Sequence, residues 1–261
     1  MKVVVLDRPS EAARRIVEAI LSALSRKPDL VLGLATGSTP LEVYEGLVRA
    51  RRDRDVDFSR VMTFNLDEYL DLPPDHEQSY RSFMRKHLFS GVNIPPDRIH
   101  FPPSQGSNLA AQCLAYEKKI RDAGGIDIQI LGIGSNGHIG FNEPTSSLAS
   151  RTRVKTLAEK TIRDNSRFYG PGEHPPPLAA TMGIGTILEA RKIFLQAFGN
   201  KKADAIRAAV EGPISTVWPG SALQLHPDVT FYLDRESASK LSLLDYYRRV
   251  AENERAMADR M

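Results

Sequence analysis

A glycine-rich stretch at residues 131–144, LGIGSNGHIGFNEP, contains a histidine and a glutamate five positions apart. In one tight turn the Glu143 carboxylate can pair with the His138 imidazole, orient it and favour its protonated form. Asn136 and Asn142 lie in the same turn, so the set suits general acid–base chemistry. The alternative is that His138 has no catalytic role. We do not expect a metal site, because no H-E-x-x-H motif or histidine pair is present.

The glycines of this stretch have the spacing G-x-G-x-x-G, which binds dinucleotides when it follows a strand and opens a helix. The preceding residues, IDIQIL at 126–131, have the pattern of a short buried strand. Gly140 and Pro144 then interrupt the turns that should begin the helix. We therefore expect no dinucleotide cofactor, and the glycines need another explanation.

A second polar segment, TGSTP at 36–40, follows another apolar run. Thr39 is suited to cap a helix and Pro40 to occupy its first position. Gly37 allows close approach of the backbone, and the hydroxyls of Thr36 and Ser38 lie beside it. This arrangement predicts a site for an anion such as phosphate. A helix that is capped and does nothing else is the alternative.

A third segment, NLDEYL at 65–70, places two carboxylates at the end of an apolar run. Carboxylates in such a position are costly unless they are solvated, paired or functional. Asp67 or Glu68 could therefore serve as a general base, and a carboxylate that caps the next turn is the alternative.

The composition bounds the class of protein. A chain of 261 residues with 41% hydrophobic and 26% charged residues is ordinary for a globular protein. The net charge is only +3, and the basic run RARRDRD at 49–55 is interleaved with aspartates, so nucleic-acid binding is not expected. The single cysteine, Cys113, falls within a helical apolar pattern and should be packed. Neither a membrane span nor a signal peptide is apparent, which favours a cytoplasmic protein.

Strand and helix patterns alternate along the chain, which predicts an α/β fold with a mainly parallel open sheet and helices on both faces. This architecture is Rossmann-like but without dinucleotide binding. The expected strands are 3–6, 30–35, 61–66, 126–131, 192–198 and 229–234, and the expected helices are 11–24, 40–50, 79–89, 108–123, 203–210 and a C-terminal helix. We expect one domain, 1–261, with a lid around 156–178. Loops at the carboxyl ends of parallel strands meet, so the three polar segments should converge.

These segments resemble the glucosamine-6-phosphate deaminase (isomerase) family over nearly the whole chain. The matching words are LATGSTPLEVY, FNLDEYL, GIGSNGHIGFNEP, SRTRVKTL, NSRF and AVEGPIS…LQLHPDVT. Sugar-phosphate lactonases share the sheet and the glycine turn, but their pattern differs after the histidine. The continuation G-F-N-E-P therefore favours the deaminases.

The resemblance implies conversion of glucosamine 6-phosphate and water to fructose 6-phosphate and ammonia, without cofactor or metal. It implies that His138 opens the sugar ring, with Glu143 and Asn136 orienting it, and that Asp67 moves a proton from C2 to C1. Many members carry Asp at the position of Asn136, so a changed pH dependence is expected here. A phosphosugar lactonase and a non-catalytic sugar-phosphate sensor are the alternatives.

The resemblance also assigns binding positions. Those implied for the substrate are Thr36, Gly37, Ser38, Thr39, Gly137, Arg167 and Lys202. In members activated by an acetylated amino-sugar phosphate, a second phosphate site uses positions that match Ser146, Arg153 and Lys155. A homo-oligomer is a further expectation, whereas partners such as nucleic acid or membrane are not expected.

Overall fold

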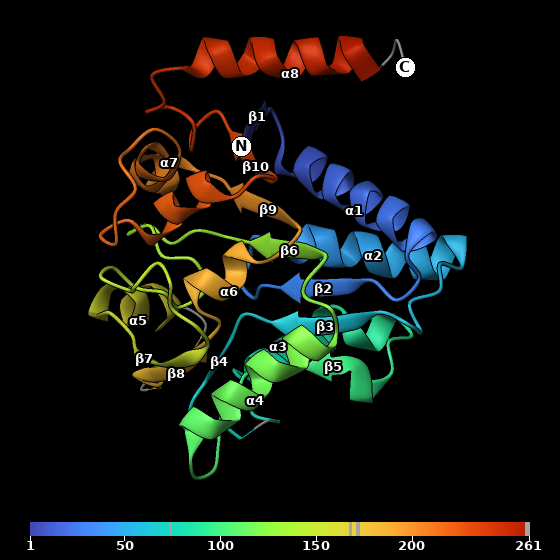
Figure 1. Cartoon of the computed structure of the whole chain (residues 1–261), viewed down its shortest axis with the longest axis vertical. Helices are drawn as coiled ribbons and strands as arrows, with labels where there is room; N and C mark the ends of the chain where they lie inside the picture. Colours follow the sequence, from blue (N-terminus) through green and yellow to red (C-terminus); the bar gives the residue numbers. More distant parts are fainter. Residues whose placement is uncertain (74, 167–168, 171–172, 259–261) are drawn as a thin grey trace.

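The computed structural model describes residues 1–73, 75–166, 169–170 and 173–258. Within this part of the chain, seven parallel strands form the central sheet in the order β1-β10-β9-β6-β2-β3-β5 (Figure 1). The strands are β1 (Lys2–Leu6), β2 (Val31–Leu34), β3 (Met62–Asn65), β5 (Ile99–His100), β6 (Ile128–Leu131), β9 (Lys192–Ala197) and β10 (Val229–Asp234). The predicted mainly parallel α/β fold is confirmed.

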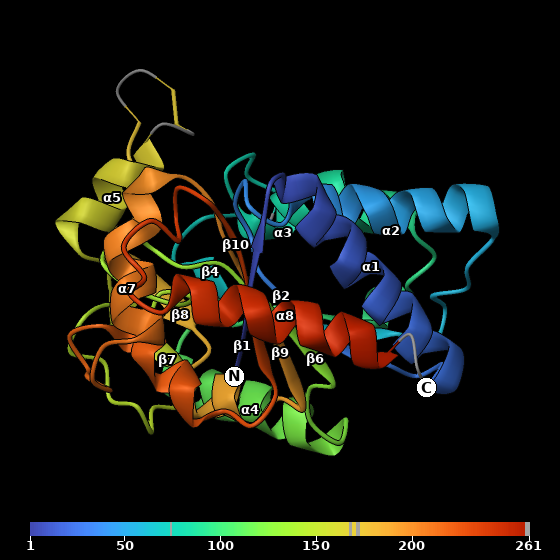
Figure 2. The ribbon, with the colours of Figure 1, turned by 90° about the horizontal axis from the view of Figure 1, so that it is seen from above.

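Helices cover both faces of this sheet (Figure 2). They are α1 (Pro9–Arg26), α2 (Leu41–Arg54), α3 (Tyr80–His87), α4 (Leu109–Asp122), α5 (Glu159–Asn165), α6 (Ile184–Leu188), α7 (Ala203–Val210) and α8 (Leu244–Ala258). Short 3-10 helices are η1 (Phe89–Gly91), η2 (Pro96–Arg98), η4 (Asn200–Lys202) and η5 (Pro219–Leu225). The six strands and six helices predicted from the sequence are all present, with ends shifted by a few residues.

Two apolar cores result, one on each face. On one face, Ile16, Ile20 and Leu24 of α1 pack with Leu47 of α2 and Leu34 of β2. Their spacing of four residues places them on one side of α1, which explains why the helix lies flat on the sheet. On the other face α4, α6 and α7 pack against alternate residues of the same strands. Cys113 is buried on α4, as predicted.

A second, three-stranded antiparallel sheet was not predicted. It consists of β4 (Asp67–Tyr69), β8 (Leu178–Thr181) and β7 (Arg153–Thr156), in the order β4-β8-β7. Strand β4 begins two residues after β3 ends, so the chain passes from one sheet into the other at Asp67. Thr181 of β8 pairs with Asp67 on one side and with Arg153 on the other.

Helix α5 belongs to the segment that joins β7 to β8. Thr156 pairs with Leu178, and the Leu157 N–H donates to the Pro177 carbonyl at 2.9 Å, so both ends of this segment are fixed together. The segment coincides with the lid expected at 156–178. Its movement, and the limits of the domain, stay predictions. In the described residues, no helix is long and apolar enough to span a bilayer.

Candidate active site

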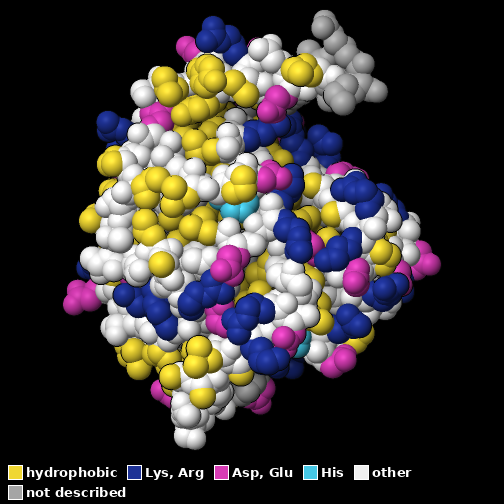
Figure 3. All heavy atoms as spheres, viewed as in Figure 1, with side chains coloured by type: hydrophobic (Ala, Val, Ile, Leu, Met, Phe, Trp, Pro, Cys, Tyr) yellow, Lys and Arg dark blue, Asp and Glu magenta, His cyan; other side chains and the backbone are white. Residues whose placement is uncertain are grey.

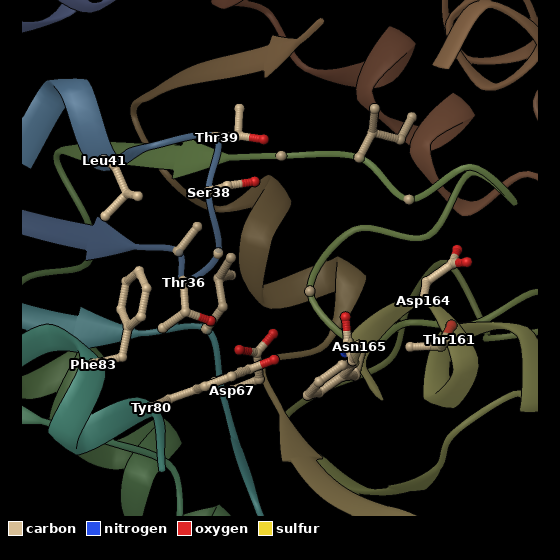
Figure 4. A pocket seen from close by; sticks show the side chains of 18 of the residues that line it. Thr36, Ser38, Thr39, Leu41, Asp67, Tyr80, Phe83, Thr161, Asp164 and Asn165 are labelled. Atoms are coloured by element: carbon tan, nitrogen blue, oxygen red, sulfur yellow. The ribbon is translucent and has the colours of Figure 1, made fainter. Parts of the chain in front are cut away.

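A cavity of about 1850 Å³ lies at the carboxyl ends of the central strands. Its lining comes from the loops after β2, β6 and β9, from the start of β4, and from α3 and α5. Figure 4 shows side chains of α3 and α5 on opposite sides of Asp67. The predicted site residues that line this cavity are Thr36, Gly37, Ser38, Thr39, Asp67, His138 and Lys202. The predicted convergence of the three polar segments is therefore confirmed.

Asp67 is buried, with 6% of its surface exposed, and it faces the cavity (Figure 4). Burial raises the pKa of its carboxyl to about 8, and the nearby charge of Glu68 adds to the rise. Within the described part of the chain, no hydrogen bond or ion pair holds this carboxylate. A buried carboxyl with a raised pKa that faces a cavity is suited to accept and return a proton.

The structure distinguishes between Asp67 and Glu68, the two carboxylates that the sequence left as alternatives for the general base. Glu68 is absent from the cavity lining, and its oxygens accept the backbone N–H groups of Tyr69, Tyr80 and Arg81. Both oxygens of Glu68 are engaged by backbone donors, and its side chain does not line the cavity, so Glu68 is not placed to meet a substrate there. Asp67 is the better candidate for the base.

His138 and its two predicted partners are brought together in the turn after β6. The Nδ1 atom of His138 lies 3.6 Å from Oε2 of Glu143, and Asn136 donates its Nδ2–H to the same oxygen at 2.8 Å. Burial raises the pKa of Glu143, but hydrogen bonding and charge from His138, with further bonds from Thr161 and Asn136, lower it to about 2. Glu143 is therefore a carboxylate throughout the neutral range and can orient the imidazole.

The glycines of this turn are required by close neighbours and by positive φ angles. A Cβ on Gly134 would lie 2.3 Å from Cε1 of His138, so only glycine leaves room for the imidazole. Gly137 has a φ of 82°, and a Cβ there would lie 2.6 Å from the Trp218 ring. Gly140 has a φ of 56°, and its missing Cβ would lie 3.4 Å from Oδ2 of Asp67. After β6 the chain forms this turn instead of a helix, which agrees with the failed dinucleotide pattern.

The loop after β2 offers backbone to the cavity. Gly37 has a φ of 103°, and nothing lies within 4 Å of the position where its Cβ would be. The predicted cap by Thr39 is wrong, because α2 begins at Leu41, and Pro40 is the N-cap residue without a side-chain cap bond. The Pro40 carbonyl already accepts the N–H groups of Val43 and Tyr44, so the helix starts one residue later than expected.

Lys202 reaches across to the histidine turn. Its Nζ donates to the Ile133 carbonyl at 2.6 Å, which places an ammonium beside the glycine turn at the cavity wall. Arg167, the other cation implied for the substrate, lies outside the described residues.

Comparisons with known proteins agree with this geometry. Residues 7–231 match the family model described as glucosamine-6-phosphate isomerases/6-phosphogluconolactonase. The chain belongs to this family. It is 56% identical to glucosamine-6-phosphate deaminase of Hahella chejuensis over 248 residues, covering 95% of each chain. It is 54% identical to the same-named protein of Shewanella loihica over 255 residues, covering 97% of this chain and 95% of the relative.

Solved structures of the glucosamine-6-phosphate isomerase/6-phosphogluconolactonase family give the same fold. A structure described as a monomeric glucosamine-6-phosphate deaminase has a TM-score of 0.89 at 42% identity, covering 92% of this chain and all of that one. A 6-phosphogluconolactonase from Leishmania guyanensis has a TM-score of 0.74 at 22% identity over 92% of this chain and 98% of that one. The second likeness concerns the fold alone.

The three positions matched to a regulatory site of the family are not part of the cavity lining. Ser146 is buried, and its Oγ has no partner among the described residues. Arg153 donates to Oδ1 of Asn142 at 2.9 Å, and burial lowers the pKa of its guanidinium. Lys155 lies two residues further along β7. Their use as a second phosphate site stays a prediction.

Sequence reasoning missed a row of polar groups beside Asp67. Asn165 of α5 donates to the Tyr69 hydroxyl at 2.9 Å, and the hydroxyls of Tyr69 and Tyr80 lie 3.4 Å apart. Tyr80 also bonds to Thr36 of the loop after β2. Tyr69 follows Asp67 by two positions on one strand, so a strand assignment for 67–69 would have placed both on one face.

Replacing Asn136 by Asp tests the family position in which this chain differs. The change removes the amide donor 2.8 Å from Glu143 and puts a second carboxylate there, so negative charge near His138 increases. If His138 must be neutral to accept a proton, the step of the pH–rate profile that belongs to His138 should move upward by about one pH unit, whereas the step that belongs to Asp67 stays in place. If the protonated form is required, activity should extend to higher pH. A folded variant with an unchanged pH–rate profile would exclude Asn136 from this role.

Proposed function

We propose that this protein is a glucosamine-6-phosphate deaminase, which converts glucosamine 6-phosphate and water to fructose 6-phosphate and ammonia. One observation carries the proposal: a buried carboxyl, Asp67, faces the same cavity as a histidine that is backed by the charged Glu143. The printed names of relatives at 56% and 54% identity support it.

The first step requires the closed sugar ring to open. His138 would accept the proton of the anomeric hydroxyl and deliver a proton to the ring oxygen, and the C1–O bond to that oxygen breaks. The Glu143 carboxylate keeps the imidazole in place and stabilises its charged form between the two transfers. Asn136 donates to the Glu143 oxygen that faces His138 and so helps to hold that carboxylate in place.

The second step is proton transfer between neighbouring carbons. Asp67 would remove the proton from C2 of the open chain and return it to C1, which converts the amino aldehyde through an enolamine to a ketose imine. Water then adds to C2, and the C–N bond breaks to release ammonia. A pKa near 8 makes Asp67 a stronger base than an ordinary aspartate, because its protonated form is stabilised by burial.

The phosphate would bind at the loop after β2. Gly37, Ser38 and Thr39 border the cavity just before α2, where backbone N–H groups and the helix N-terminus favour an anion. Lys202 lines the same cavity and would supply a positive charge, and the family resemblance adds Arg167.

The lactonase alternative is less well supported. Hydrolysis of a lactone needs an activated water but no base that shuttles a proton between C2 and C1. The lactonase structure from Leishmania guyanensis is 22% identical to the chain, far below the 56% of the Hahella chejuensis deaminase.

The sensor alternative is also less well supported. A sensor would need neither Asp67 nor the His138–Glu143 pair, since binding alone makes no use of them.

Ammonia release from glucosamine 6-phosphate tests the proposal directly. We expect stoichiometric ammonia and fructose 6-phosphate, little turnover of unphosphorylated glucosamine, and little hydrolysis of 6-phosphogluconolactone. Rapid lactone hydrolysis without ammonia release would select the lactonase, and binding without either reaction would select the sensor.

We also propose a cytoplasmic homo-oligomer. The segment 212–225 contains no charged residue, and it exposes Ile214, Val217 and Leu225 by 41%, 55% and 61%. Figure 3 also shows apolar side chains gathered in patches on one face of the molecule. Exposed apolar patches of this kind often mark protein contacts. Light scattering after size exclusion measures the state, and a monomeric mass over the working concentration range would refute the proposal.

A further inference from the structure

Glu68 is a buried carboxylate that the reaction steps above do not use. Only 2% of its surface is exposed, although its neighbours along β4, Asp67 and Tyr69, both line the cavity. A buried carboxylate is costly unless donors compensate it. Its hydrogen bonds therefore indicate what it is for.

Among the described residues, the donors that compensate Glu68 are backbone N–H groups. Oε1 accepts from Tyr80 at 2.9 Å and from Tyr69 at 3.0 Å, and Oε2 accepts from Arg81 at 2.9 Å. Tyr80 and Arg81 are the first two residues of α3, so the carboxylate lies at the N-terminus of that helix. Burial raises the pKa of Glu68 above its ordinary value, and these three donors offset part of that rise by favouring its charged form.

The start of α3 is thereby fully satisfied. The first four N–H groups of a helix have no partner within the helix. Here Ser79 donates to the His76 carbonyl, Tyr80 and Arg81 donate to Glu68, and Ser82 donates to Oγ of Ser79. Two of these four bonds come from one side chain of the neighbouring strand, so Glu68 fixes the first turn of α3 to β4.

This anchor determines where Tyr80 lies. The Tyr80 side chain extends along the cavity wall toward Asp67 (Figure 4). Its ring packs against Tyr69 with centroids 4.9 Å apart and stacks on Phe141 at 5.8 Å. Its hydroxyl meets the Tyr69 hydroxyl and Thr36. If the first turn of α3 shifted, the wall beside Asp67 would shift with it.

We propose, on the basis of the function proposed above, that Glu68 is a positioning residue for proton transfer at C2. Its carboxylate holds Tyr80 against the cavity side of Asp67 and keeps a second negative charge next to the base. The first effect excludes water and fixes geometry, and the second strengthens Asp67 as a proton acceptor. Glu68 acts through these neighbours and does not touch the substrate.

Glu68→Gln separates this role from a merely structural one. The glutamine amide carries no charge, and its N–H group faces the Arg81 N–H instead of accepting from it. Because the first turn of α3 and Tyr80 would then shift, we expect kcat to fall about 10- to 100-fold. Without the charge, Asp67 should lose its proton more readily, and the acid limb of kcat/KM should move down by about one pH unit. Amide hydrogen exchange at Tyr80 and Arg81 should accelerate.

Glu117→Gln is the matched control. Glu117 is equally buried at 2% and also accepts a backbone N–H, that of Thr152 at 2.8 Å, but it is not part of the cavity lining. The Glu117→Gln substitution should destabilise the fold to a similar degree without moving the pH profile of kcat/KM. An equal shift in both variants, or an unchanged profile and unchanged exchange in Glu68→Gln, would overturn the proposal.

Glu68→Asp keeps the charge but shortens the side chain, so it isolates the anchor. We expect a lower kcat with an unmoved acid limb, and wild-type kcat would exclude the anchoring role. If Glu68→Gln does not fold, Glu68→Asp and Tyr80→Phe replace it, and wild-type kcat in both would overturn the proposal. If the wild type releases no ammonia, the proposed function fails, while the exchange at Tyr80 and Arg81 still tests the anchor.

Discussion

Replacing Asp67 by Asn should reduce kcat by roughly two to four orders of magnitude, the range expected when a general base is removed. The amide has nearly the same shape as the carboxyl but cannot accept the proton from C2. The other cavity residues, including His138 and the loop after β2, are unaffected by the change. Binding of a substrate analogue should therefore persist, and ring opening should continue while ammonia release stops.

The measurement is a comparison of ammonia release with analogue binding in the same preparation. Calorimetric titration with fructose 6-phosphate would give the affinity, which should change less than tenfold. Ammonia release within tenfold of the wild type would remove Asp67 from the role of base. Loss of binding together with turnover would indicate a structural role instead.

The same variant makes an independent prediction about stability. The pKa of Asp67 is about 8 in the folded protein against an ordinary value of 3.8. Between these values the folded state retains a proton that the unfolded chain has released, so stability falls as the pH rises from about 4 to about 8. Asparagine does not titrate. The Tm of Asp67→Asn should therefore increase relative to that of the wild type as the pH rises through this window. A difference in Tm between the two proteins that does not change with pH would contradict the raised pKa of Asp67.

Much of the architecture could be predicted because periodicity reports burial. The strand at 30–35 is buried on both faces, so it appears as a continuous apolar run, and the helix at 11–24 shows the spacing of an amphipathic helix. Once the sheet is taken as parallel, the carboxyl ends of the strands must share one edge. That rule alone predicts that Asp67 and His138 lie close together at this edge.

The antiparallel sheet could not be predicted, because its strands are short and its pairing is long-range. Strand β4 has three residues and pairs with β8, which begins at Leu178. Three residues are too few for an alternating pattern to emerge. The position of Tyr80 beside Asp67 could not be predicted either, because the two residues lie on different elements and α3 has the pattern of an ordinary amphipathic helix. The cap of α2 was misplaced by one residue, where sequence signals are least reliable.

Replacing Gly134 by Ala should abolish most activity without destabilising the protein. The added Cβ would lie 2.3 Å from Cε1 and 2.4 Å from Nδ1 of His138, far inside contact distance. The imidazole would have to rotate away from Glu143, because the backbone of the turn is fixed by the bond from the Gly134 N–H to the His138 carbonyl at 2.8 Å. A displaced base in an otherwise intact site should lower kcat/KM about 100-fold.

Gly132→Ala is the matched control in the same turn. Gly132 lines the cavity, and nothing lies within 4 Å of the position that its Cβ would take, so the methyl group enters the cavity without touching the imidazole. In both variants alanine restricts the unfolded chain more than glycine does, which should raise stability by about 0.4–1 kcal/mol where the backbone permits it. Any difference in activity between the two variants then reports the position of the imidazole.

Steady-state kinetics and thermal unfolding of both variants check this prediction. We expect Gly132→Ala to keep kcat/KM within a few-fold of the wild type, and Gly134→Ala to retain its Tm and its affinity for fructose 6-phosphate while losing turnover. Equal activity in the two variants would show that the imidazole can move without consequence. His138 would then not be the ring-opening residue, and the glycine at position 134 would need a different explanation from the one its contact with His138 provides.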